Sequence, residues 1–214
     1  MIENGIGASV RRKEDQRFLI GKGNYTDDIN VAGQTHAVFV RSPHAHAEIK
    51  GIDCSDALAA PGVVAVLTGD DLAADGIGPL ICGVTVTSGD GEPHRAPAHP
   101  VLAQGKVNYV GDHVAIVIAE TGAQARDAAE LVDVDYSVLP AVIDTGSAAD
   151  SGQPQIHEVA PDNVCYNWPF GDKEGVEAAF AGAHKVSKLD LLNNRRVTNP
   201  MEPRAALGEY NQGT

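Results

Sequence analysis

The stretch between residues 110 and 142, VGDHVAIVIAETGAQARDAAELVDVDYSVLPAV, constrains the fold most, because it predicts a strand, a helix and a second strand in succession. Residues 114–119 form a continuous apolar run, which is typical of a strand buried on both faces. Residues 132–138 alternate apolar and polar side chains, which predicts a half-buried strand with one acidic face. Pro140 ends this strand because proline has no N–H to donate to a neighbouring strand.

The helix between the two strands has its own start signal. Thr121 and Gln124 form a T-x-x-Q capping box, in which the threonine hydroxyl accepts the Gln124 amide and the glutamine side chain returns to Thr121. We expect the helix to run to about residue 131. Its core-facing side should carry the residues at i, i+4, i+7 and i+8, which are Gln124, Ala128, Leu131 and Val132.

Other parts of the chain show weaker patterns of the same two kinds. Before this stretch, we expect strands at residues 34–42, 47–53 and 63–67, and short helices at 56–60, capped by Ser55, and from Thr68 or Asp70 to 74. After it, we expect a helix at 174–183 with Val176, Ala179, Phe180 and Ala183 on one face, and strands at 185–192 and 205–210.

The domain organisation is predicted from polar, glycine-rich and proline-rich segments. Residues 1–20 read as a polar arm, and residues 75–105 as a long surface excursion of the kind that carries function or wraps a partner. Residues 144–155 are small and polar, so we place a linker at 146–157. The remaining residues, 158–214, end on a newly started strand and are expected to be an incomplete domain.

Charge and composition exclude some classes of partner. The formal net charge of −13 argues against nucleic acid and anionic membrane surfaces. No apolar run approaches the roughly 20 residues of a membrane span, and we expect no secretory leader. The three cysteines lie far apart without a C-x-x-C motif, which favours a reducing compartment, and we expect the cytoplasm.

Only a few side chains are candidates for chemistry. In a strand, His44 and His46 would share a face and could bind one metal ion, but no third ligand is evident, so packing is the favoured interpretation. His94 and His99, in the surface excursion, are equally unsupported as ligands. The remaining candidates are carboxylates, for which we favour helix capping at Asp27–Asp28 and Asp70–Asp71 and a solvated strand face at Asp133 and Asp135.

Glu202 is the most interesting acid. It lies between Met201 and Pro203, and an acid beside apolar groups can have a raised pKa and act as a proton relay or ligand acceptor. A structural turn is still the favoured interpretation. Three nearby arginines could neutralise it or meet an anionic cofactor: Arg195, Arg196 and Arg204.

Six blocks of the sequence carry a family resemblance. They are GIGASVRRKEDQRFLIGKGNYTDDI, VRSPHAHA, PGVVAVLTGDDL, VNYVGDHVAIVIAET, VDYSVLPAV and NNRRVTNPMEPRAALGEY. In this order they resemble successive blocks of the molybdenum-binding large subunit of the xanthine dehydrogenase family, and within it most of all aerobic carbon monoxide dehydrogenase. The resemblance implies an α+β fold, with an α/β hammerhead domain at residues 21–145 and the start of a first molybdopterin-binding domain at 158–214.

The resemblance also implies a role within a larger enzyme. Complete members oxidise a substrate at a molybdenum–molybdopterin centre, here expected in the cytosine dinucleotide form. They pass electrons to [2Fe–2S] clusters on a small subunit and FAD on a medium subunit. The loops that meet molybdenum and select the substrate are expected to lie downstream of these residues. We therefore expect no catalytic or metal-binding residue in this chain and no activity of the chain alone, and only Glu202 is expected to support a substrate pocket.

Two hypotheses follow for the chain itself. It is either the N-terminal part of such a large subunit, or a free-standing, non-catalytic hammerhead module used in assembly or interaction. As part of a large subunit, it would have the rest of that subunit and the iron–sulphur and flavin subunits as partners. In that case we expect contacts through residues 75–100 and the N-terminal arm.

Overall fold

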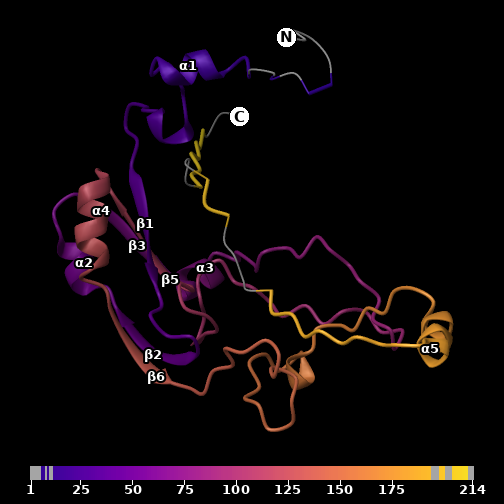
Figure 1. Cartoon of the computed structure of the whole chain (residues 1–214). Coiled ribbons are helices and arrows are strands. Elements are labelled where there is room, and N and C mark those ends of the chain that lie inside the picture. Colours follow the sequence, from indigo (N-terminus) through magenta and orange to yellow (C-terminus); the bar gives the residue numbers. More distant parts are fainter. Residues whose placement is uncertain (1–5, 8, 10–11, 194–197, 201–203, 212–214) are drawn as a thin grey trace. The chain divides into compact units, whose positions relative to one another are not determined.

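The computed structural model describes residues 6–7, 9, 12–193, 198–200 and 204–211 (Figure 1). The chain divides into two compact units. The larger unit, Thr35–Val186, contains every strand found among the described residues. The smaller unit consists of Met1–Gln34 and Ser187–Thr214.

The first sheet of the larger unit is organised around β5, His113–Ala119. It lies between β1, His36–Arg41, and β3, Val63–Thr68, and pairs antiparallel with both. The predicted strand at residues 114–119 is therefore confirmed as the central strand. Its continuous apolar run is explained by burial, because Val114, Ala115, Val117 and Ala119 are each fully buried.

The second sheet is organised around β2, Ala47–Asp53. It pairs antiparallel with β4, Lys106–Val107, and with β6, Asp133–Val138. On β6 the predicted alternation holds at Val134 and Tyr136, which are partly buried. Val138, however, is 65 % exposed, so the apolar face of this strand stops one alternation earlier than predicted.

Helix α4, Gly122–Ala129, connects the two sheets, because it follows β5 in one and precedes β6 in the other (Figure 1). The predicted cap is present: the Thr121 hydroxyl accepts the Gln124 N–H at 3.3 Å and donates to the Gln124 side-chain oxygen at 2.8 Å. The predicted core face is confirmed at Ala128, which is buried, and at Val132, which packs against the same cluster, but it is wrong at Leu131. Ala125 and Ala128 are the buried residues, whereas Leu131 is 46 % exposed, because the helix ends at Ala129 and Leu131 no longer continues its face.

The core consists of two small clusters. One lies between the first sheet and helices α4 and α2, Ser55–Ala59, and its buried members are Ala57, Val66, Val117 and Ala128. The other lies against the second sheet, and its buried members are Ala47, Ala103, Val107 and Val114. Since Val114 and Val117 both belong to β5, one strand supplies side chains to both clusters.

Two short helices begin with the caps that the carboxylate pairs predict. In α3, Gly69–Ala74, the Asp71 carboxylate accepts the Thr68 backbone N–H and hydroxyl, both at 2.7 Å. In the smaller unit, the 3-10 helix η1, Thr26–Asp28, has its Asp28 carboxylate accepting the Tyr25 N–H at 2.9 Å. Capping at these two aspartates is thus confirmed. The smaller unit also contains α1, Asp15–Leu19, within the predicted polar arm.

The last third of the chain departs most from the sequence predictions. The predicted helix is present as α5, Lys173–Gly182, and a 3-10 turn, η2, Pro161–Asn163, precedes it. The strands predicted at residues 185–192 and 205–210 are absent from the described residues. The reason is that a strand needs a hydrogen-bonded neighbour, and no described segment pairs with either stretch. The predicted domain boundaries and linker stay predictions.

Candidate functional site

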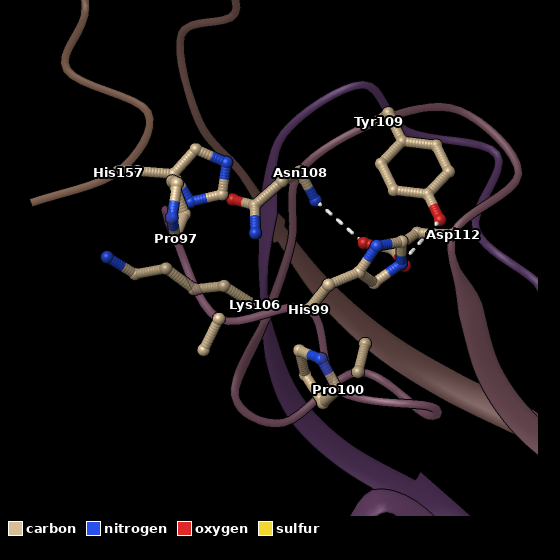
Figure 2. A pocket seen from close by; sticks show the side chains of 10 residues that line it. Pro97, His99, Pro100, Lys106, Asn108, Tyr109, Asp112 and His157 are labelled. Carbon is tan, nitrogen blue, oxygen red and sulfur yellow. Dashed lines mark hydrogen bonds between the residues drawn. The ribbon is translucent and has the colours of Figure 1, made fainter. Parts of the chain in front are cut away.

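A pocket of about 240 Å³, lined by both apolar and polar side chains, lies within the larger unit on the loops that surround β4 (Figure 2). One wall comes from the segment before β4, a second from β4 and the turn that leads into β5, and a third from the segment that follows β6. The lining residues are Pro97, Ala98, His99, Pro100, Ala103, Lys106, Asn108, Tyr109, Asp112 and His157. The long surface excursion predicted from the sequence therefore helps to build a concave site.

Asp112 is the buried acid of this pocket and is 7 % exposed. Its carboxylate accepts the Asn108 backbone N–H at 3.0 Å, and its backbone carbonyl accepts the Ser42 N–H at 2.8 Å. Ser42 in turn accepts the Gly111 N–H at 2.8 Å. These bonds hold the turn before β5 against the end of β1, so the position of the Asp112 side chain is determined by backbone pairing.

Tyr109 and His99 form a hydrogen-bonded pair at the mouth of the pocket, with the hydroxyl 3.3 Å from Nε2 of the imidazole (Figure 2). Burial, followed by the negative charge of Asp112, raises the pKa of Tyr109. A tyrosine with a raised pKa stays protonated at neutral pH. Tyr109 is therefore suited to donating a hydrogen bond rather than to acting as a base.

Histidines gather near Asp112 and are held towards their neutral form. Burial lowers the pKa of His157, and the nearby imidazole of His46 lowers it further, while Asp112 opposes both effects. Burial likewise lowers the pKa of His113, and Arg41 adds to this. Burial disfavours the charged imidazolium because the surroundings are partly dry, and a positive charge on a neighbouring group disfavours it further.

The His44–His46 pair does not form a shared ligand set. His46 is buried at 5 % exposure, and its Nδ1 lies 2.8 Å from the Pro140 carbonyl, to which it must donate. His44 instead packs edge-on against Tyr136, with ring centroids 5.0 Å apart. The packing interpretation is therefore confirmed for both. The metal interpretation is not supported, since no cluster of three or more histidine, cysteine or acidic groups among the described residues could hold a metal ion.

The pocket suits a small polar group better than a large cofactor. Its volume lies below the roughly 300–1,000 Å³ of pockets that hold drug-sized ligands, and a molybdopterin dinucleotide is larger still. Two buried acceptors, Asn108 Oδ1 and His46 Nε2, have no hydrogen-bond partner among the described residues, and each calls for a donor. This pocket therefore does not fit the cofactor that the family resemblance implies.

The remaining candidates lie apart from this pocket. Asp133 and Asp135 are exposed on β6, as the solvated interpretation predicts. The three cysteines are free, and burial raises the pKa of Cys54. Glu202, Arg195 and Arg196 lie outside the described residues, so the prediction about Glu202 stays a prediction. No helix in the described part of the chain is long and apolar enough to cross a membrane.

Sequence reasoning named His99 without assigning it a role and missed Tyr109, Asp112 and His157. No local motif could have shown these residues, because the pocket joins side chains from residue 97 to residue 157. The one usable signal was the glycine- and proline-rich excursion, which indicated a functional loop without indicating what it surrounds.

The class of protein follows from comparison with known families. Residues 20–140 match the family described as aldehyde oxidase and xanthine dehydrogenase, a/b hammerhead domain. This match covers more than half of the chain, so the chain belongs to this family. The α+β fold and the hammerhead domain expected from the sequence are thereby confirmed.

The individual relatives are large subunits of enzymes, and one of the similar crystal structures is that of a molybdenum enzyme. The chain is 42 % identical over 212 residues to the carbon monoxide dehydrogenase large chain of Afipia carboxidovorans, which covers 92 % of this chain and 25 % of the relative. It is 40 % identical to the nicotine 6-hydroxylase large subunit of Paenarthrobacter nicotinovorans, over 97 % of this chain and 24 % of the relative. A crystal structure of Cu,Mo-CO dehydrogenase matches with a TM-score of 0.68 and 38 % identity, over 85 % of this chain and 23 % of that one.

The chain thus spans about a quarter of the length of the curated relatives it matches. It is homologous to part of the large subunits of carbon monoxide dehydrogenase and the molybdenum hydroxylases, which are oxidoreductases. Members of these enzymes contain molybdenum and are built from several subunits.

Proposed function

We propose that this chain acts as the N-terminal, hammerhead-containing part of the molybdenum subunit of an oxidoreductase of the carbon monoxide dehydrogenase or molybdenum hydroxylase type. The observation that carries the proposal is continuous similarity over 92–97 % of the chain to only a quarter of each large subunit. If the chain had a function unrelated to these enzymes, we would not expect the similarity to extend on both sides of the hammerhead domain.

Catalysis is proposed to occur outside this chain. The cofactor of the complete enzyme is proposed to be molybdenum with the cytosine dinucleotide form of molybdopterin, and it supplies the redox chemistry when bound. The contribution of the pocket around Asp112 is proposed to be structural, because this pocket is too small for that cofactor and its acid is engaged in a backbone hydrogen bond. Glu202 is proposed to support the substrate pocket from a neighbouring position, as its match to the family block implies.

The proposed partners are the rest of the large subunit, a small subunit with [2Fe–2S] clusters and a medium subunit with FAD. The proposed location is the cytoplasm. The similarity to a subunit of the 6-hydroxypseudooxynicotine dehydrogenase complex, at 35 % identity over 94 % of this chain, supports a multi-subunit assembly. The acidic net charge of −13 supports protein partners over nucleic acid.

A second candidate function is a free-standing, non-catalytic hammerhead module. One observation favours it: both core clusters are completed within Thr35–Val186, so these two clusters form without any other chain. Such a module would work in assembly or interaction without molybdenum.

Purification of the tagged chain from its own host separates the two candidates. Molybdenum would be measured in the eluate, and every co-eluting polypeptide would be identified by mass spectrometry. Molybdenum together with a polypeptide that matches the remaining three quarters of the family's large chains is the expected result. A pure, metal-free chain would refute the enzyme proposal and leave the module. As a control, the chain purified alone should show no dehydrogenase turnover even when molybdenum is supplied.

A further inference from the structure

The apolar side chains of α5 and the segment before it face solvent. Every residue from 166 to 186 is exposed. Val176 and Phe180 of the helix are 54 % and 59 % exposed, and Trp168 and Phe170 of the preceding segment are 65 % and 93 % exposed. We call the set Trp168, Phe170, Val176, Ala179 and Phe180 the α5 face. A group of exposed apolar side chains on one helix and the segment before it marks an interaction site more often than an isolated exposed residue does.

The α5 face is attached to a structured part of the larger unit. The Asn167 carbonyl accepts the Gly89 N–H at 2.6 Å, and the Asn167 N–H donates to the Ser88 hydroxyl at 3.1 Å. Nearby, the Cys165 carbonyl accepts the Arg95 N–H at 2.8 Å. These bonds tie the segment before α5 to the long excursion, the magenta trace that passes beside it in Figure 1. The face is therefore presented from a fixed base.

Helix α5 has a defined start but no packing partner among the described residues. The Asp172 carboxylate caps it by accepting the Gly175 N–H at 3.0 Å. Lys173 and Glu177 form an exposed pair at 3.8 Å, so the charged side of the helix is partnered within the helix itself. A helix of ten residues is marginal in water by itself, and most helices of this length are stabilised by packing an apolar face.

We propose that the α5 face is the docking surface for the polypeptide that corresponds to the remaining three quarters of the relatives' large chain. This inference rests on the proposed function. Helix α5 lies inside the part of the chain that matches, since one relative is aligned over 97 % of it. The counterpart of the helix in that relative belongs to a chain about four times longer, which supplies polypeptide to cover it.

The chemistry of the face specifies the kind of surface that docks on it. Two aromatic rings, Trp168 and Phe170, lie 6.0 Å apart at its edge, and Val176 and Phe180 line the helix. Burial of such a cluster is favourable only against an apolar patch, and large aromatic side chains are the residues that contribute most at protein interfaces. The occupant is thus an apolar groove of the large-chain remainder.

Three variants of the full chain test the proposal in its own host. Phe180→Asp and Val176→Asp place a charge in the face. Ala178→Asp places the same charge about 200° around the helix from Val176, on the opposite side, and is the matched control. All three positions are exposed, so circular dichroism and thermal unfolding of the purified variants should match the unmodified chain. The readout is recovery, by quantitative mass spectrometry, of a polypeptide that matches the family's large chain outside the matched quarter.

The expected result is that Phe180→Asp and Val176→Asp each weaken binding of that polypeptide at least about 30-fold, or about 2 kcal/mol, while Ala178→Asp leaves it unchanged. Equal recovery with all variants would overturn the docking surface and leave the proposed function standing. No such polypeptide with any variant, including the unmodified chain, would overturn both.

A second copy of this chain is the competing occupant. Trp168 is the only tryptophan in the sequence, so its emission reports directly on this face. With the purified chain alone, we expect acrylamide quenching of Trp168 to be independent of protein concentration. Quenching that falls with concentration, and that Phe180→Asp restores, would show self-association and overturn the proposal.

Discussion

Replacement of Val117 by alanine tests whether β5 is the central buried strand. Val117 is fully buried and packs in the cluster with Ala57, Val66 and Ala128. The change removes two buried methyl groups, at about 0.8 kcal/mol each, and the cavity left behind adds roughly another 1 kcal/mol. We therefore expect the free energy of unfolding to fall by about 2–3 kcal/mol, a large part of the ~5–15 kcal/mol typical of a folded domain.

The assay is urea unfolding of the full chain followed by far-UV circular dichroism, with Tm measured in parallel. A loss of this size should lower Tm by about 5–10 °C for a chain of this length. Val64→Ala is the matched control, since Val64 lies in the neighbouring strand β3 and is 60 % exposed. Its expected cost is within about 0.5 kcal/mol. Equal losses for the two variants would refute the assignment of Val117 to the core.

Two further results are expected. Gly69→Ala should destabilise the chain by about 1–3 kcal/mol, because an added Cβ would lie 2.5 Å from the Ala103 carbonyl oxygen. Gly78 has open space around it, so Gly78→Ala should unfold at the same urea concentration as the unmodified chain. The free energy of unfolding should also fall as pH drops below about 6.5. Burial and a neighbouring imidazole lower the pKa of His157 in the folded chain. Below this pH the unfolded chain therefore binds more protons than the folded one. His157→Gln should flatten this part of the profile of unfolding free energy against pH, and an unchanged slope would contradict the cause assigned here.

The proposal that α5 docks another polypeptide changes how the failed strand predictions are understood. Residues 185–192 have a strand-like pattern, yet they form no strand among the described residues and are exposed. A pattern of this kind predicts which residues a strand would bury, but the strand forms only where a neighbour offers hydrogen bonds. The same reasoning applies to α5: the helix was predicted from its apolar spacing, and none of its residues is buried.

The helix caps could be predicted from the sequence, whereas the candidate site could not. The carboxylate caps at Asp71 and Asp28 were predictable, because a capping side chain and its N–H lie within three residues of each other. The pocket around Asp112 was not predictable, because His99 and His157 approach it only after both sheets have formed. Local rules act across one helical turn, whereas this site depends on contacts across the whole larger unit.

The sequence by itself determined where the strands and helices of the hammerhead region lie. The apolar run of β5, the alternation of β6 and the Thr121 cap are local features that depend on neighbouring residues alone. Only the tertiary structure decided that β5 and β6 belong to different sheets, which histidines meet Asp112 and which apolar face remains uncovered. The physical reason is that strand pairing and side-chain proximity are set by long-range packing, for which a single sequence carries no local signal.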